Sequence, residues 1–441
     1  MTTPRHASDM KDSGIEWVGM IPKNWNKNKI RYLVQLINGY PFQSSLYSNE
    51  GFFVVRITNV DDGKLNTNNP RYYPEELVDE YKSCLLKGND ILMSLTGNVG
   101  LVGIVDESYP KSALNQRVGC IRVSSPLIMH KYLYYLLTTQ DFSEAATLYS
   151  KGTVQLNMST EWLLNERIPI PDISEQQAIA NYLDDRCSKI DEIIAEATAS
   201  IEEYKELRVA TITECVSRGL DNNDIETRDS GDSWVGDIPC HWKLCKVKNI
   251  ASYVSDGAHV SPETDNGVYS FISTVNLRDG VLDFDNCLCT SEESYRQLVK
   301  NGCQPIRDDV LISKDGSVGK TTVIDYDREF VVSSSLVIIR PRTDIINPYF
   351  LQYNLQSNFV QQRLLLLMHG AGLKRVSVAK NSNLPVVLPP VDEQIMIVEY
   401  LDRKISEIDS LILEKQALIN DLQAYKKSLI YEVVTGKRRV V

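Results

Sequence analysis

Residues 314–321 contain lysine, glycine and threonine in an order that resembles a phosphate-binding loop. In such a loop, backbone N–H groups and a lysine hold the phosphates of a nucleotide. The pattern requires a glycine five positions before the Gly-Lys-Thr glycine, and this chain has Lys314 there. A related segment, residues 95–102, keeps the glycines but lacks the lysine and the threonine. The shared glycines indicate a tight turn after a strand, so we predict no nucleotide site.

The segment Asn347-Pro-Tyr-Phe350 resembles the Asn-Pro-Pro-Tyr/Phe loop with which amino-methyltransferases hold a flipped base. One proline is missing, and the chain has no glycine-rich turn of the kind that binds S-adenosylmethionine. Asparagine as a helix N-cap, with proline at the first helical position, explains these residues fully. We therefore expect the start of a helix here rather than a methyltransferase site.

The other candidates for catalysis and metal binding are isolated residues. Pro171-Asp172 and Glu203-Tyr-Lys205 imitate the acids and lysine of a nuclease, but the second segment falls on an amphipathic helical pattern, where solvated charges are ordinary. None of the five histidines has a nearby acid or nucleophile at a catalytic spacing. Cys287, Cys289 and Cys303 lack the paired spacing and the fourth ligand of a zinc site. We predict no catalytic residue, no metal and no cofactor bound by this chain.

The elements that carry these residues occur twice, at an offset of about 218 residues. The recurring blocks are Glu16–Trp25 and Ser233–Trp242, Asp90–Gly100 and Asp309–Gly319, Glu175-Gln176 and Glu393-Gln394, and Ile190-Asp191 and Ile408-Asp409. Four blocks in one order are not chance. The protein therefore consists of two copies of one unit, each with a globular part and a long helix.

The globular part of each copy contains short runs of β-branched and aromatic residues bounded by Gly, Asn, Asp and Pro, which indicate strands. In the first copy the strands are Phe52–Thr58, Asp90–Leu95, Leu101–Val105 and Val118–Val123, with one helical stretch, His130–Thr138, whose copy is Asn347–Leu355. We predict an α+β fold with two mixed α/β domains, residues 15–171 and 229–390, in a pseudo-two-fold tandem repeat. Residues 1–14 are expected to form a frayed, flexible tail.

Long helical spacers are predicted at residues 172–228 and 391–441. Apolar residues recur there at alternating steps of four and three, which is the pattern of a coiled-coil seam. The seam contains Leu183, Ile190, Ile194 and Ile201 in the first helix, and Leu401, Ile405, Ile408, Ile412, Ile419 and Leu422 in the second. A single helix would leave its seam in water. We therefore expect an antiparallel coiled coil of roughly 60 Å with one globular domain at each end.

The formal net charge of −11 is concentrated in one segment. Residues 172–236 hold 6 Lys and Arg against 16 Asp and Glu, while the remaining segments are near neutral. Either globular domain can therefore present a basic face to nucleic acid despite the acidic total. No apolar run is long enough to span a bilayer, the N-terminus does not resemble a signal peptide, and the nine cysteines are scattered. We expect a cytoplasmic protein with no membrane partner.

Polar residues on glycine-containing loops are the candidates for contacts to DNA. Arginine and lysine can bind guanine edges, asparagine and glutamine can bind adenine edges, and glycine lets the backbone approach a phosphate. The candidates are Thr96, Asn98, Asn115, Gln116, Arg117, Lys151, Thr153, Gln155 and Asn157 in the first copy, and Lys314, Ser317, Lys320, Thr321, Lys374 and Arg375 in the second. These side chains differ between copies while the glycines persist, as expected of two domains with different half-sites. The alternative is that they are ordinary surface turns that drifted.

The chain resembles the specificity (S) subunits of type I restriction-modification systems. The resemblance rests on the Trp-Val-Gly-x-Ile-Pro-x-x-Trp opening, the Asp-Ile-Leu-x-Ser…Gly-x-Val-Gly block and the Pro-x-x-x-Glu-Gln helix start, and it covers nearly the whole chain twice. It implies two target-recognition domains joined by helical spacers. Each domain would recognise one half of a bipartite, asymmetric double-stranded DNA site, and the helices would set the spacing.

The resemblance also implies partners that carry the chemistry. Two modification subunits would dock on this chain and methylate adenine with S-adenosylmethionine, and restriction subunits using ATP and Mg would cleave DNA. The residues themselves indicate only a two-ended, pseudo-symmetric binder. Two alternatives stay open: an autonomous sequence-specific DNA-binding or architectural protein without an enzyme partner, and a coiled-coil assembly scaffold whose domains do not contact DNA.

Overall fold

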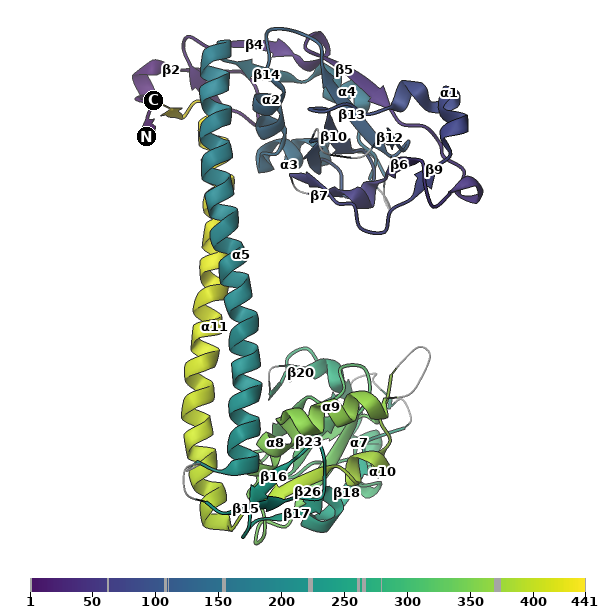
Figure 1. Ribbon diagram of the computed structural model, residues 1–441, viewed down its shortest axis with the longest axis vertical. Coiled ribbons are helices and arrows are strands. Elements are labelled where there is room, and N and C mark those ends of the chain that lie inside the picture. The colour runs from purple at the N-terminus through teal and green to yellow at the C-terminus, as the bar shows by residue number, and fades with distance from the viewer. Residues whose placement is uncertain are drawn as a thin grey trace. The chain divides into compact units, whose positions relative to one another are not determined.

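The structure is a computed structural model, and it describes residues 2–61, 63–106, 109, 111–152, 156–220, 225–259, 262–263, 267–278, 280–368 and 374–440. Its internal contacts divide the chain into two compact units. Unit one contains residues 1–197 and 417–441, and unit two contains residues 198–416. Each unit has one globular domain and a part of each long helix (Figure 1). This division differs from the predicted one, because the helices share hydrophobic cores with the domains.

The domain of unit one contains a four-stranded antiparallel sheet of order β11-β10-β13-β5 and a three-stranded sheet of order β12-β6-β9. The first sheet consists of β5 (Val34–Asn38), β10 (Ile91–Ser94), β11 (Val102–Ile104) and β13 (Val118–Val123). The second consists of β6 (Phe52–Val55), β9 (Tyr72–Tyr73) and β12 (Ser112–Leu114), with β12 and β6 parallel. Two-stranded pairs are formed by β2 (Met10–Asp12) with β3 (Met20–Pro22), β4 (Asn26–Lys29) with β14 (Arg167–Ile170), and β7 (Val60–Asp61) with β8 (Lys64–Leu65). The helices are α1 (Val78–Tyr81), α2 (His130–Leu137), α3 (Gln140–Leu148) and α4 (Thr160–Asn165).

The domain of unit two repeats this arrangement. Its four-stranded sheet has the order β18-β26-β23-β24, and its three-stranded sheet has the order β22-β19-β25 with β19 and β25 parallel. The strands are β15 (Thr227–Asp229), β16 (Asp237–Pro239), β17 (Lys243–Lys246), β18 (Ala251–Asp256), β19 (Tyr269–Ile272), β20 (Leu277–Arg278), β21 (Val281–Leu282), β22 (Leu288–Thr290), β23 (Val310–Ser313), β24 (Thr321–Val323), β25 (Phe330–Val332), β26 (Leu336–Pro341) and β27 (Pro385–Leu388). The helices are α6 (Val247–Ile250), α7 (Glu292–Lys300), α8 (Pro348–Gln356), α9 (Asn358–Leu367) and α10 (Val378–Ser382). The internal repeat predicted from the sequence is therefore a structural repeat.

The central strands are apolar on both faces because each lies between two cores. Ile91 and Met93 of β10 belong to the cluster formed with the helices, while Leu92 belongs to the cluster under the second sheet. In β23, Val310 and Ile312 face the helix cluster, and Leu311 faces the other. This explains why these strands have continuous apolar runs in the sequence rather than alternating ones.

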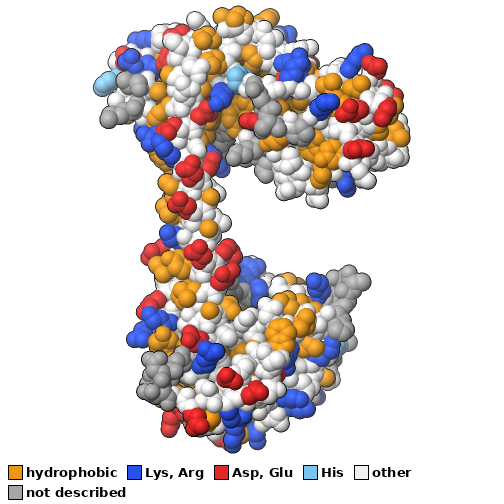
Figure 2. All heavy atoms as spheres, viewed as in Figure 1, with side chains coloured by type: hydrophobic (Ala, Val, Ile, Leu, Met, Phe, Trp, Pro, Cys, Tyr) orange, Lys and Arg blue, Asp and Glu red, His pale blue; other side chains and the backbone are white. Residues whose placement is uncertain are grey.

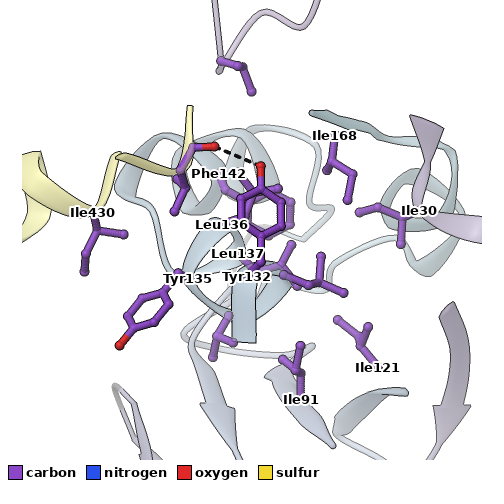
Figure 3. Close-up of a cluster of buried hydrophobic side chains, with 14 of the residues drawn as sticks. Ile30, Ile91, Ile121, Tyr132, Tyr135, Leu136, Leu137, Phe142, Ile168 and Ile430 are labelled. Carbon is purple, nitrogen blue, oxygen red and sulfur yellow. Dashed lines mark hydrogen bonds between the residues drawn. The ribbon is translucent and has the colours of Figure 1, made fainter. Parts of the chain in front are cut away.

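The core of unit one extends from the domain into the helices. Tyr132 of α2 is fully buried among residues such as Ile30, Ile121 and Ile168, and its hydroxyl group is hydrogen-bonded to the carbonyl of Val434 at 3.0 Å (Figure 3). Burial raises the pKa of Tyr132 well above its usual value, so the hydroxyl stays a donor. The buried hydrogen bond therefore links α2 to the end of the last helix.

The two long helices are α5 (Ile173–Arg218) and α11 (Val391–Val434). Asp172 caps α5, because its carboxylate accepts the backbone N–H of Glu175 at 2.8 Å. In unit one, Lys426 of α11 forms an ion pair with Asp191 of α5 at 2.6 Å. In unit two, Arg208 of α5 pairs with Asp409 of α11 at 3.2 Å. Every predicted seam residue is buried or half-buried, and the helices run past each other in opposite directions within each unit.

The prediction of a frayed N-terminal tail is wrong for the described part of residues 1–14. Thr2–Pro4 forms β1, which pairs with β28 (Arg438–Val440) at the other end of the chain, and β2 pairs with β3. The polar composition of the tail concealed this, because the strand partner is more than 430 positions away. The prediction of one helical stretch per domain is also incomplete: α2 and α8 are confirmed, but each is followed by a second helix, α3 or α9.

Among the described residues, no helix combines the length and the apolar composition needed to cross a membrane.

Candidate nucleic-acid interface

The residues that recur between the copies hold the scaffold together. In unit one, Trp25 donates its indole N–H to Glu175 at 2.9 Å, and in unit two Trp242 donates to Glu393 at 2.9 Å. The following glutamine in each copy bonds only to backbone. Gln176 accepts the N–H of Met129 and donates to the carbonyls of Leu127 and Pro171, and Gln394 does the same with Asn347, Ile345 and Pro389. The Glu-Gln motif therefore fastens each long helix to its domain.

A second recurring pair lies inside each four-stranded sheet. Asp90 binds Arg122 through two hydrogen bonds of 2.8 and 2.6 Å, and Asp309 binds Arg340 through two of 2.9 and 2.8 Å. Asp90 is 2% exposed and Asp309 is fully buried. The hydrogen bonds to the carboxylate raise the pKa of Arg122 and of Arg340 further, so both guanidinium groups stay charged. The aspartate that begins the recurring Asp-Ile/Val-Leu block is therefore structural.

In unit one, the three candidate loops meet at the end of β10. The N–H of Leu95 bonds to the carbonyl of Arg117 at 3.1 Å, and the N–H of Gly97 bonds to Leu156 at 2.9 Å. Lys151 and Asn157 exchange backbone hydrogen bonds of 3.0 and 2.8 Å. The segments 96–100, 115–117 and 151–157 were chosen from separate parts of the sequence, and the structure brings their described residues together.

Most of the described candidate residues of unit one lie at the surface. Asn98, Gln116, Arg117, Lys151 and Asn157 are exposed. Thr96 and Asn115 are half-buried and have local partners: the Thr96 hydroxyl donates to the Asn157 side chain at 3.1 Å, and the Asn115 side chain accepts the N–H of Arg117 at 3.3 Å. These two side chains shape the loops. Thr153 and Gln155 lie outside the described residues.

In unit two, the corresponding loops meet at the end of β23. The N–H of Lys314 bonds to the carbonyl of Ser335 at 2.9 Å, and the N–H of Val376 bonds to the carbonyl of Lys314 at 2.7 Å. Asp315 and Arg375 form a backbone bridge. Gly97 and Gly316 both have positive φ angles, of 79° and 66°, as the turn predicted after each strand requires.

Two of the candidates in unit two do not face outward. Thr321 is 3% exposed in β24, and its hydroxyl accepts a hydrogen bond from Gln356 at 2.9 Å, so its prediction as a DNA contact is wrong. The side chain of Lys314 is 13% exposed and forms an ion pair with Asp256, so it supports the loop and is not a free cation. Lys320, whose amino group approaches the carbonyl of Leu277 at 3.4 Å, is exposed, as are Ser317, Lys374 and Arg375.

Sequence analysis missed one loop of unit two. Asn115–Arg117 has its structural copy in Ser333–Ser335, because both segments join the parallel strand of the small sheet to the long strand of the large one. Tyr40 bridges Asn115 in unit one, and Ala258 bridges Ser333 in unit two. The repeat offset of about 218 residues would have identified this serine loop, whereas residue type did not.

A hollow of about 420 Å³ opens beside the loops of unit two and is lined by Asp256, Lys314, Arg375, Val376, Ser377, Val378 and Lys380. His259 also contacts Asp256, at 3.0 Å. Burial raises the pKa of Asp256, but hydrogen bonds and charge from Lys314 and His259 outweigh it, so the pKa is lowered overall. Burial raises the pKa of Asp315, against the partial compensation of Lys314 and Arg375. The hollow therefore contains an internal ion pair with further cations around it.

The residues directly after β5 and β18 lie so close to the backbone at the start of these loops that only glycine fits. A Cβ atom on Gly39 would lie 2.1 Å from the carbonyl of Asn115, and one on Gly257 would lie 2.0 Å from the carbonyl of Val332. Either is far inside van der Waals contact. The position of both loops is thus fixed by the scaffold, while their exposed side chains vary.

Comparison with known proteins gives a consistent family match. The family model described as "Type I restriction modification DNA specificity domain" matches residues 22–203 and again residues 239–421. The chain is 23% identical over 437 residues to the type I restriction enzyme EcoBI specificity subunit of Escherichia coli, covering 97% of this chain and 88% of the relative. It is 22% identical to the putative type I restriction enzyme MjaX specificity subunit of Methanocaldococcus jannaschii, covering 96% of each chain.

The fold has a counterpart among solved structures. A chain from a structure described as the structural basis of complex assembly and conformational transition of the type I R-M system aligns with a TM-score of 0.68 and 16% identity, covering 95% of this chain and 99% of the other. This similarity concerns the fold alone.

Proposed function

The chain belongs to the type I restriction-modification DNA specificity family, and from this premise we propose that it recognises the DNA target of such a system without catalysing a reaction. Each globular domain contacts one half of a bipartite, asymmetric double-stranded site through the loops at the end of β10 or β23. The exposed residues of these loops make the contacts, and they include Asn98, Gln116, Arg117, Lys151 and Asn157 in unit one, and Ser317, Lys320, Lys374 and Arg375 in unit two.

This proposal rests on the difference between the residues that the two copies share and the residues in which they differ. The shared residues, such as Asp90 and Asp309, are buried in the scaffold and bind other parts of it. The exposed residues at the strand ends differ in type between the copies. Phosphate contacts position a protein on DNA, and contacts to base edges specify the sequence. Two copies with one scaffold and different loops suit two different half-sites.

We propose that α5 and α11 form a continuous antiparallel coiled coil that sets the half-site spacing and binds two modification subunits. Its surface supports a protein partner, because apolar side chains are exposed among acidic ones along the helices (Figure 2). These apolar residues include Ile193, Leu207, Leu411, Leu413, Leu418 and Tyr425. S-adenosylmethionine would bind to the modification subunits, and ATP and Mg to restriction subunits in the full complex.

Genomic methylation provides the direct test. DNA of the source strain is sequenced for methylated adenine, with this gene intact and with it deleted. We expect one interrupted, asymmetric adenine motif to lose its methylation in the deletion strain and to regain it when the gene is restored. If an active modification system shows no change at any motif, the proposed function is wrong.

The salt dependence of DNA binding separates the alternatives. The chain, alone or with its modification subunits, is titrated with a duplex that contains the motif. For a DNA-binding protein, log K should fall linearly with log salt, with a slope of about −0.9 for each phosphate neutralised. Tight specific binding by the chain alone would favour an autonomous DNA-binding protein. A flat response would favour an assembly scaffold.

A further inference from the structure

Unit one contains an open pocket of about 410 Å³, and none of the proposed DNA-contacting residues lines it. The pocket is lined by Glu16, Trp17, Asp141, Glu144, Ala145, Leu148, Tyr149, Trp162 and Glu166. It lies where α3, α4 and the loop before β3 come together. Leu148 and Tyr149 at its edge are 74% and 49% exposed, so they offer apolar surface beside the pocket.

Aromatic rings form the walls of this pocket. Tyr149 stacks on Trp162 with ring centroids 5.4 Å apart and planes 17° from parallel. Phe142 lies behind them, 5.9 Å from Trp162 and 5.3 Å from Trp17. The rings are therefore held in place by one another, and they present π surfaces to whatever enters.

Four carboxylates surround these rings. Glu166 accepts the indole N–H of Trp17 at 3.2 Å, and Glu144 accepts from Gln140 at 2.7 Å. Glu16 is exposed and Asp141 is half-buried. Within the described part of the chain, no lysine or arginine forms an ion pair with any of the four. The negative charge of the pocket is thus left for an outside partner to balance.

The second copy shows that the acidity is not needed for the fold. The structural repeat places Ser233, Phe359, Gln362 and Leu384 where unit one has Glu16, Asp141, Glu144 and Glu166. All four carboxylates are thereby absent, and Lys380 stands at the position of Trp162. Trp234, the counterpart of Trp17, is 46% exposed. The same helices pack in both units, so the acidic aromatic pocket is a feature that unit one alone carries.

This chemistry selects the class of ligand. A carboxylate-lined pocket repels DNA phosphates and attracts a cation. Aromatic faces favour a planar guanidinium, which stacks on rings and binds carboxylates through two hydrogen bonds, over a compact ammonium. The exposed Leu148 and Tyr149 offer apolar area to the segment that carries the cation, which a free small ion would leave unused.

We propose that this pocket binds an arginine side chain presented by a protein partner, so that unit one has a docking site that unit two lacks. The arginine lies between the Tyr149–Trp162 pair and the carboxylates of Asp141 and Glu144. The binding itself requires no DNA, and only the cellular test below rests on the proposed function.

Fluorine NMR of the full chain, labelled with 5-fluorotryptophan, tests the pocket directly. The chain has five tryptophans: Trp17, Trp25, Trp162, Trp234 and Trp242. On titration with N-acetyl-arginine amide, we expect the resonances of Trp17 and Trp162 to shift. Trp25 and Trp242 are buried, and Trp234 occupies the equivalent place in unit two, so these three serve as internal controls.

Two variants and two further probes give the controls. Asp141→Asn combined with Glu144→Gln removes two carboxylate charges with little change of side-chain shape and should weaken arginine amide binding about tenfold or more, as expected for the loss of charge-assisted hydrogen bonds. Glu161→Gln changes an exposed carboxylate on α4 that does not line the pocket, and it should leave binding unchanged. N-acetyl-citrulline amide, a neutral analogue of nearly the same shape, should not shift Trp17 or Trp162.

The outcomes separate the possibilities. Equal shifts with the citrulline analogue, or no shift with arginine amide, would overturn the proposal. A stronger response to spermine than to arginine amide would replace it with a site for a free polycation.

In cells, the Asp141→Asn, Glu144→Gln variant should lower methylation of the motif several-fold relative to Glu161→Gln, while the purified variant binds DNA normally. Unchanged methylation would rule out a partner docking at this pocket in the assembled complex. If deletion of the gene leaves methylation of the motif unchanged, the proposed function is refuted. The NMR result on arginine binding does not depend on that outcome.

Discussion

Units one and two have the same scaffold, but the ends of their central strands carry different chemistry. In unit one the exposed loop residues are mainly amides, with Arg117 and Lys151 as the cations. In unit two they are mainly basic, with Lys320, Lys374 and Arg375 exposed. The strand order, the parallel pair and the ion pair inside the sheet are the same in both. A repeat of this kind separates structure from function within one chain: what recurs is buried and bonded, and what differs is exposed.

The largest expected effect tests whether the scaffolds are equivalent. Arg122→Met and Arg340→Met each leave a buried aspartate without its partner. Breaking such a pair costs about 3–5 kcal/mol, and we expect the lower end, about 3 kcal/mol, because both arginines are partly exposed. Hydrogen exchange read at β10 and β13, or at β23 and β26, reports the free energy of opening of each unit separately.

The control for this comparison is Arg307→Met, which breaks an exposed pair with Asp327 in unit two. Its effect should be much smaller than that of either buried pair, because water screens an exposed ion pair. If Arg122→Met and Arg340→Met differ from each other by more than the effect of Arg307→Met, the two scaffolds are not energetically equivalent, and the shared aspartate has a different role in each copy.

The next largest effect distinguishes the half-site that the loops of unit one bind from the half-site that the loops of unit two bind. Arg117→Ala should weaken binding to the methylated motif by about 1–3 kcal/mol and relax the preference at one half-site only, and Arg375→Ala should do so at the other half-site. Fluorescence anisotropy with duplexes mutated in either half measures this. Because the two arginines lie in different units, the double variant should show additive losses. A loss at both half-sites from one substitution would contradict the assignment of one domain to each half.

Thr321→Val provides the matched control for the DNA experiment. Thr321 is buried and bonded to Gln356, so the change removes a hydroxyl group without altering the surface. DNA affinity should stay the same, while the chain loses a little stability. A specific loss of DNA affinity would restore the role that the burial of Thr321 argues against.

Much of the scaffold could be predicted because its signals are local or repeated. The strands at residues 91–94 and 118–123, the helix at 130–137 and the coiled-coil seams all follow from runs or periods within a short window. Strand order could not be predicted, because pairs such as β5 with β13 join segments about 80 residues apart through backbone groups that every residue has. The pairing of β1 with β28 is the extreme case.

The candidate site was predicted in part, for a related reason. Residue type identified Arg117 and Lys151 in unit one, and Arg375 in unit two, as exposed polar groups. Within each unit, the structure places these residues in loops that meet at the end of the central strand. Residue type could not distinguish Lys314 from Lys320, because one faces Asp256 inside the unit and the other faces solvent. That difference depends on a side chain 58 positions away. The serine loop at 333–335 carried no charge and was visible only through the repeat.

The smallest expected effect concerns the stability of unit two at acidic pH. Unit two has Asp256 paired with Lys314 and His259, whereas unit one has Asn38 and Leu95 at the equivalent positions of the repeat. The folded pKa of Asp256 is lowered, so its contribution to stability is present above the unfolded value of about 3.9 and is lost as the pH falls through the lower folded value.

Asp256→Asn copies unit one and removes this titration. The stability advantage of the natural chain over this variant, at most about 1 kcal/mol for one such pair, should therefore shrink below about pH 4. Urea unfolding of both chains between about pH 3 and pH 6 measures this difference in the free energy of unfolding. An advantage that grows on acidification would mean that the pKa of Asp256 is raised, and that burial outweighs its partners in the folded unit.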